Sequence, residues 1–273
     1  LGRIILEEAD RLLSPPTSVV SIIWGQSEVG TLQPIQSIGK LCKERNIIFH
    51  TDATQILANG LFDWKVLNVD MLSCSAHKFQ GPKGIGILLT KSFSRKFIKP
   101  LQGGGLQENG FRSGTEPLAL IAGMNKALYC INKKIILENN DIIFTKSKVS
   151  EYTRELYNNL KEVKGIQFTG YSLCKYRLPN HISLLVSSKD YKPLIARNVV
   201  RELSKFGVYT SSGSACSSSL IKDNETLKAM GYDNKWLQSG LRISLGNWIK
   251  SNQIKQIPTL LEKAMFNVQQ RSN

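Results

Sequence analysis

The sequence predicts an α/β fold, with a mostly parallel central sheet in a large domain and a smaller α+β domain at the carboxy-terminal end. Apolar runs typical of buried strands alternate with segments of helical spacing in the first half of the chain. A polar stretch at 138–141 then precedes shorter strands and more polar helices. We therefore expect a large domain over residues 1–140 and a small domain over residues 141–273.

The large domain is expected to begin with a strand–helix–strand alternation. Pro34 favours a helix over Ile35–Arg45, and Pro117 is expected to begin a long helix that reaches about Asn139. The glycines between Gly81 and Gly86 favour a hairpin turn into the last strand. The expected strands are Val19–Trp24, Ile47–Asp52, Asp70–Ser75 and Gly84–Leu89.

The small domain shows the same two kinds of pattern at a shorter scale, which indicates an α+β arrangement. Helices are expected over about Lys146–Val163, Leu194–Phe206 and Gln253–Gln269. Strands are expected near Gln167–Gly170, His181–Leu185, Val208–Ser211 and Leu241–Leu245. No internal repeat is visible.

Composition limits the classes of function that the chain can have. The 273 residues, 41% of them hydrophobic, suit a globular protein, and no apolar run approaches the ~18 residues of a membrane span. The formal charge of +15 comes from dispersed lysines, so we expect attraction of an anionic cofactor and acidic partners, without direct nucleic-acid binding. The five cysteines lack the spacing of metal ligands, so we expect no metal site. Their scattered positions also favour a protein with reduced thiols in the cytoplasm.

Lys78 is the most informative residue of the chain. It follows a small, hydroxyl-rich strand end and precedes a glycine-rich stretch, while Asp52 ends another apolar run and Gln55 follows one turn later. Ligands of open α/β sheets gather at such strand ends. Taken singly, a lysine is more often a solvated charge and an aspartate more often a helix cap. Together they are what pyridoxal 5'-phosphate (PLP) needs, an amine for its aldehyde and an acid for its ring nitrogen.

A second reactive centre is predicted in the small domain. Cys216 lies in the small-residue loop Ser211–Ser219, so it is either a mobile thiol that carries cargo or a buried cysteine in a serine-rich linker. Arg242 interrupts the apolar strand Leu241–Leu245, where it either binds a carboxylate or faces water at a sheet edge. The remaining cysteines are expected to be buried and inert: Cys42, Cys74, Cys130 and Cys174.

Seven short segments run in a fixed order over nearly the whole chain. They are Thr51–Gln55, Ser75–Lys78 with Gly81–Gly86, Gly103–Gly105, Arg112–Thr115, Leu178–Asn180, Ser211–Cys216 and Leu241–Gly246. This ordered set resembles the cysteine desulfurases of the NifS/IscS-like group, which are PLP enzymes of the class V aminotransferase family. The resemblance implies PLP-dependent transferase fold type I.

The resemblance also implies a role for each matching residue of the large domain. Lys78 would bind PLP covalently and later move the Cα proton, while Asp52 would pair with the pyridinium nitrogen. The other implied cofactor contacts are Gln55 to the phenolic oxygen, Ser75 and His77 to the phosphate, and Thr115 to the phosphate of a neighbouring subunit. A homodimer with shared sites follows from the last contact.

For the small domain, the resemblance implies that Arg242 holds the carboxylate of L-cysteine and that Cys216 attacks its sulfur. Alanine and a Cys216 persulfide would result. The persulfide would pass to a sulfur-acceptor protein, such as an iron–sulfur scaffold or a tRNA-thiolating enzyme. Two alternatives stay open: a related PLP lyase acting on cystine or selenocysteine, and an inactive homologue that binds a scaffold.

Three departures from the family pattern stand out, and one is the loop Leu106–Phe111, which looks one residue longer than in the family. Ser27, in Gln26-Ser27-Glu28, occupies the position of an asparagine that touches cofactor and substrate in the family. The resemblance also implies that an amino-terminal part of the family fold is absent, so PLP binding by this chain alone is a separate question.

Overall fold

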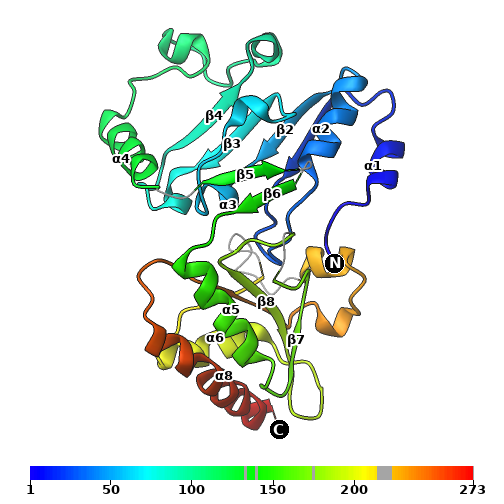
Figure 1. Cartoon of the computed structure of the whole chain (residues 1–273), viewed down its shortest axis with the longest axis vertical. Coiled ribbons are helices and arrows are strands. Elements are labelled where there is room, and N and C mark those ends of the chain that lie inside the picture. The colour runs from blue at the N-terminus through cyan, green and yellow to red at the C-terminus, as the bar shows by residue number, and fades with distance from the viewer. Residues whose placement is uncertain (132–133, 139–140, 174–175, 214–222, 273) are drawn as a thin grey trace. The chain divides into compact units, whose positions relative to one another are not determined.

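The computed structural model describes residues 1–131, 134–138, 141–173, 176–213 and 223–272 (Figure 1). It divides into two compact units. The amino-terminal unit comprises Ile4–Gly25 and Gln33–Thr145, and the carboxy-terminal unit comprises Leu1–Arg3, Gln26–Leu32 and Lys146–Asn273. The segment Gln26–Leu32 therefore leaves the amino-terminal unit and returns to it within a few residues, which no sequence pattern predicted.

The amino-terminal unit is built on a four-stranded sheet. Its strands are β1 (Val19–Ile23), β2 (Ile48–Asp52), β3 (Met71–Ser75) and β4 (Gly86–Thr90), in that spatial order. β1, β2 and β3 run parallel, and β4 pairs antiparallel with β3. This arrangement confirms the mostly parallel sheet and the hairpin expected after the glycine-rich turn.

One face of this sheet is covered and the other is partly open. Alternate residues of β2 and β3 are buried on the covered face, as in Phe49, Thr51 and Leu72. The helices of this unit are α1 (Leu6–Leu12), α2 (Ile35–Glu44), α3 (Thr54–Leu57) and α4 (Leu118–Tyr129). Its short 3-10 helices are η1 (Trp64–Val66), η2 (Ala76–Phe79), η3 (Ser92–Phe97) and η4 (Gln107–Gly110).

The long helix expected from Pro117 to Asn139 is wrong in its second half. α4 ends at Tyr129, and the chain then forms an antiparallel hairpin of β5 (Ile135–Glu138) and β6 (Asp141–Phe144). The run Ile135-Ile136-Leu137 suits a strand as well as a buried helix. Hydrogen-bond pairing decides in favour of the strand, because β5 pairs with β6 and the Ile135 N–H also donates to the Leu61 carbonyl oxygen at 2.8 Å.

The carboxy-terminal unit contains an antiparallel sheet. Its strands, in spatial order, are β7 (Ile166–Phe168), β8 (His181–Val186), β10 (Gly240–Ser244) and β9 (Ser211–Ser212). The strand expected over Val208–Ser211 is shorter and begins later. The Val208 N–H donates to the Leu203 carbonyl and so closes the preceding helix rather than joining the sheet.

Three helices cover one face of this second sheet. They are α5 (Lys148–Leu160), α6 (Ala196–Lys205) and α8 (Ser251–Ser272), and the unit also holds α7 (Glu225–Ala229) and η6 (Asn234–Trp236). Ile182, Leu184, Leu241 and Ile243 of β8 and β10 belong to the core that these helices share. The alternate residues, His181 and Arg242 among them, therefore face the opposite side. Of the helices described, none combines the length and apolarity required to cross a bilayer.

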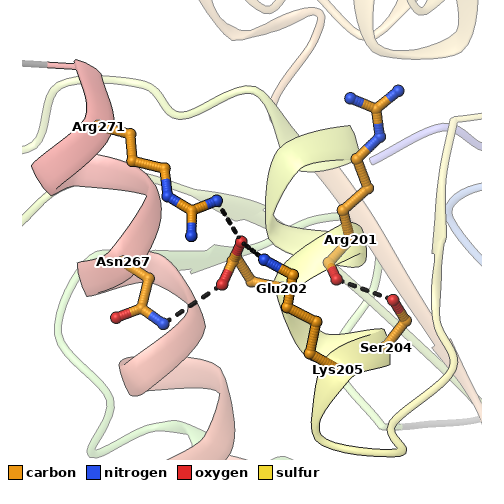
Figure 2. A network of polar contacts seen from close by, with 6 residues as sticks. All are labelled: Arg201, Glu202, Ser204, Lys205, Asn267 and Arg271. Atoms are coloured by element: carbon orange, nitrogen blue, oxygen red, sulfur yellow. Dashed lines mark hydrogen bonds and ion pairs between the residues drawn. The ribbon is translucent and has the colours of Figure 1, made fainter.

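A charged cluster joins α6 to α8 (Figure 2). The buried carboxylate of Glu202 accepts hydrogen bonds from Lys205 Nζ and Arg271 Nη1, both at 2.6 Å, and from Asn267 Nδ2 at 3.3 Å. The hydrogen bond from Lys205 is the main reason that the pKa of Glu202 lies below its ordinary value. Because its partners lie on both helices, Glu202 fixes the carboxy-terminal helix against α6.

Candidate functional site

The carboxyl edge of β2 and β3 carries the first group of candidate residues. Asp52 is the last residue of β2 and aligns with Ser73 of β3. Two residues later Ser75 ends β3 and leads into η2, which contains His77 and Lys78. Since neighbouring parallel strands end at the same edge of a sheet, Asp52 and the η2 segment share that edge.

Gln55 joins this group through α3, the short helix that contacts η2. Asp52 fixes the start of α3, because its Oδ1 accepts a hydrogen bond from the Thr54 N–H at 2.8 Å. The N-cap residue of α3 is Ala53, so Asp52 does not cap the helix, and its contact is a local turn one residue before the cap. One carboxylate oxygen is used in this way and the other remains open.

The polar groups at this edge have unused hydrogen-bonding capacity. Within the described part of the chain, no hydrogen bond is made by Asp52 Oδ2 or by the side chains of Gln55, Ser75, His77 and Lys78. Asp52, Gln55 and Ser75 are half-buried, whereas His77 and Lys78 are exposed. Polar groups in such positions ordinarily find a partner. An amine, a carboxylate oxygen, an amide and a hydroxyl together match the functional groups of PLP, so the residues present fit that cofactor.

His50 supports this edge and was missed by the sequence analysis. Its Nδ1 lies 2.8 Å from Ser21 Oγ of β1 and its Nε2 lies 3.1 Å from Ser73 Oγ of β3. Burial lowers the pKa of His50, with Asp52 opposing that shift. The available signal was the spacing, since residues two apart on a strand share a face. His50 therefore links three strands beside Asp52.

Thr115 lines a cavity that the residues of this group do not line. It is exposed in the segment before α4 and lines a cavity of about 610 Å³ together with Gly84, Phe111 and Arg112. None of the five residues at the β2–β3 edge lines that cavity. The geometry of the β2–β3 edge therefore does not bear on the expected contact of Thr115 with the cofactor phosphate of a neighbouring subunit.

Arg242 and Ser27 meet within the carboxy-terminal unit. Arg242 is half-buried on β10, and its Nη1 donates a hydrogen bond to the Ser27 carbonyl oxygen at 2.8 Å. Burial lowers the pKa of Arg242, and the nearby charge of Glu28 partly opposes this. Ser27 thus contributes a main-chain acceptor to the setting of Arg242, which its side chain gave no reason to expect.

The cysteines differ from expectation at one position. Cys42 and Cys74 are buried, and burial is the main reason that the pKa of each thiol is raised to about 11. Cys130 is exposed at the end of α4, so the expectation that it is buried is wrong. Its position just past the helix directs it to solvent. Cys174 and Cys216 lie outside the described residues.

Comparison with known proteins identifies the family. The aminotransferase class-V model matches residues 1–257. The chain therefore belongs to the class V aminotransferases, whose members depend on PLP. This confirms the family resemblance read from the ordered motifs.

Within this family, the chain is similar to proteins named as cysteine desulfurases and to NifS-like proteins. A mitosomal cysteine desulfurase of Trachipleistophora hominis is 35% identical over 259 residues, which is 94% of this chain and 56% of the relative. The X-ray structure of a NifS-like protein from Rickettsia africae has a TM-score of 0.80 at 26% identity, covering 98% of this chain and 68% of that one. SspA in complex with cysteine has a TM-score of 0.70 at 30% identity, covering 89% and 63%. The chain thus spans little more than half of its curated relative, and the structural likeness confirms the PLP-dependent transferase fold type I.

Proposed function

We propose that the chain acts as a PLP-dependent cysteine desulfurase, which converts L-cysteine to L-alanine and transfers the sulfur to Cys216. One observation carries the proposal: Asp52 ends β2 and Lys78 follows the neighbouring parallel strand β3, among polar groups that have no partner within the described residues. The likeness to a named cysteine desulfurase and to a protein solved with cysteine supports the choice of reaction and substrate.

The amino-terminal unit would hold the cofactor. Bound PLP supplies an electron sink for the substrate amino acid. Lys78 would bind the cofactor and move the substrate Cα proton. General acid–base catalysis of such a proton transfer is typically worth about 10²–10⁴ in rate. The carboxylate of Asp52 would keep the ring nitrogen protonated, Gln55 would contact the phenolic oxygen, and Ser75 and His77 would bind the phosphate.

The carboxy-terminal unit would supply the substrate and sulfur contacts. Arg242 would bind the carboxylate of L-cysteine, and Ser27 would border both substrate and cofactor. The Cys216 thiolate would attack the substrate sulfur, so that an S–S bond forms, the C–S bond breaks, and its electron pair stays with the carbon that is protonated to give alanine. A thiolate is the one neutral-pH side chain soft enough for this attack.

Several finer features belong to the same proposal. Thr115 would reach the cofactor phosphate of a second subunit, so we propose a homodimer. The persulfide would pass to an acceptor protein, either an iron–sulfur scaffold or a tRNA-thiolating enzyme, and the net charge of +15 would attract an acidic one. We also propose that residues 1–140 and 141–273 form separate domains and that the protein works in the cytoplasm.

The direct test measures alanine formed from L-cysteine by the chain loaded with PLP, in the presence of a thiol reductant. Lys78→Ala should abolish both alanine formation and the visible absorbance of the bound cofactor, and Cys216→Ser should abolish alanine formation alone. Lys83→Ala, which removes a nearby exposed lysine, is the matched control and should leave the rate unchanged. No alanine from the parent chain would refute the proposal, and full turnover by Cys216→Ser would favour a lyase instead.

A further inference from the structure

His181 is an enclosed ionisable group of the carboxy-terminal unit that the proposed chemistry does not use. It is the first residue of β8, is 3% exposed, and faces away from the helices that cover the sheet. Its Nε2 lies 3.0 Å from the main-chain carbonyl oxygen of Ser27, 154 positions away in sequence. A buried histidine with a long-range main-chain partner invites a functional explanation.

The hydrogen bond fixes the tautomer of this imidazole. A carbonyl oxygen only accepts, so Nε2 must carry the proton and Nδ1 must be the bare nitrogen. Burial, and then the charge of Arg177, lower the pKa of His181 to about 3, so the ring is neutral at physiological pH. Nδ1 makes no hydrogen bond to any described residue and packs against Gly30, where an added Cβ would lie 2.6 Å away. The ring is thus held in one orientation.

The Ser27 carbonyl is shared between His181 and Arg242. It accepts from His181 Nε2 at 3.0 Å and from Arg242 Nη1 at 2.8 Å, which uses both of its lone pairs. The Arg242 side chain makes no other hydrogen bond to the described residues, so its remaining guanidinium nitrogens are available to a ligand. A guanidinium held by one arm presents a defined fork to a carboxylate.

We propose that His181 is a positioning residue, which holds the Ser27 carbonyl where it orients Arg242 toward the substrate carboxylate. The inference rests on the proposed role of Arg242. It gives Ser27 a function through its main chain, independent of the side chain that replaces the family asparagine. It also explains why a glycine is required at position 30, where the imidazole leaves no room for a side chain.

Two substitutions of His181 distinguish the effect of its hydrogen bond to the Ser27 carbonyl from the effect of the volume of its side chain. Gln places an amide N–H about as far from the backbone as His Nε2, whereas Asn is too short to reach the same acceptor. His181→Gln should therefore keep the contact with Ser27 and His181→Asn should lose it. Ser183→Ala is the matched control, because Ser183 lies on the same strand and face, is equally buried, and bonds to Thr169 Oγ1 rather than to Ser27.

The first measurement uses the PLP-loaded chain with L-cysteine. His181→Asn should raise KM about tenfold with little change in kcat. The reason is that a misplaced Arg242 would lose one hydrogen bond to the substrate carboxylate, equally in the ground state and the transition state. His181→Gln and Ser183→Ala should keep KM near that of the parent chain. A parent-like KM in His181→Asn, or an equal defect in His181→Gln, would overturn the proposal.

The second measurement needs no turnover. The side-chain ¹⁵N resonances of His181 should show the Nε2–H tautomer. The resonance of the hydrogen-bonded Arg242 guanidinium nitrogen should shift in His181→Asn and return to its parent position in His181→Gln. An Nδ1–H tautomer, or Arg242 signals that ignore position 181, would overturn the inference. If the parent chain makes no alanine, the proposed function fails, and these resonances alone decide whether His181 orients Arg242.

Discussion

Gly30→Ala tests the close approach of Gly30 to the His181 imidazole in the carboxy-terminal unit. Gly30 has a φ of +76°, and a Cβ placed there would lie 2.6 Å from Nδ1 and 3.0 Å from Cγ of His181. Real Cβ atoms do not approach that closely, so either the imidazole or the segment around Gly30 must move. The ring cannot turn away without losing its hydrogen bond to Ser27.

The expected loss of stability has two parts. A left-handed backbone costs a residue with a Cβ about 1–2 kcal/mol, and overpacking costs about 1–3 kcal/mol more. Gly30→Ala should therefore lower the free energy of unfolding by about 2–5 kcal/mol. Gly207→Ala is the matched control, since Gly207 has a φ of +74° and a Cβ added there would meet nothing within 4 Å; it should lose only the first part.

Urea denaturation of both variants, followed by circular dichroism, measures the difference. Adding His181→Ala to each variant completes a double-mutant cycle, in which removal of the imidazole should relieve about 1–3 kcal/mol in the Gly30 variant and nothing in the Gly207 variant. Equal losses for Gly30→Ala and Gly207→Ala, without coupling to position 181, would refute the close packing on which this reasoning depends.

Two further predictions concern ionisable groups. The lowered pKa of Glu202 stabilises the fold above the ordinary value of 4.5, and this contribution disappears as the pH falls through the lowered pKa. Glu202→Gln should therefore lower Tm at pH 7 and flatten its acid dependence, and an unchanged Tm–pH curve would contradict the network. With pKa values of about 11, Cys42 and Cys74 should resist iodoacetamide at neutral pH while exposed Cys130 reacts; peptide mapping decides, and labelling of Cys42 in the folded chain would contradict its burial.

Much of the amino-terminal unit could be predicted from the sequence. Apolar runs gave its strands, and a parallel arrangement places strand ends together, so residues at the ends of β2 and β3 could be expected to meet. The same argument could not separate a strand from a helix at Ile135–Glu138, because a short apolar run has no decisive periodicity. The exposure of Cys130 was equally out of reach, since it depends on where α4 stops.

The sequence by itself determined the α/β class and the family, and it singled out Lys78 and Asp52 as candidate site residues, because these inferences depend on local patterns and ordered motifs. Only the tertiary structure decided that Ser27 belongs with His181 and Arg242, which follow it by 154 and 215 positions. A hydrogen bond to a main-chain carbonyl leaves no mark on the identity of the accepting residue. The physical reason is that such contacts depend on where the folded backbone passes, and no local pattern records that.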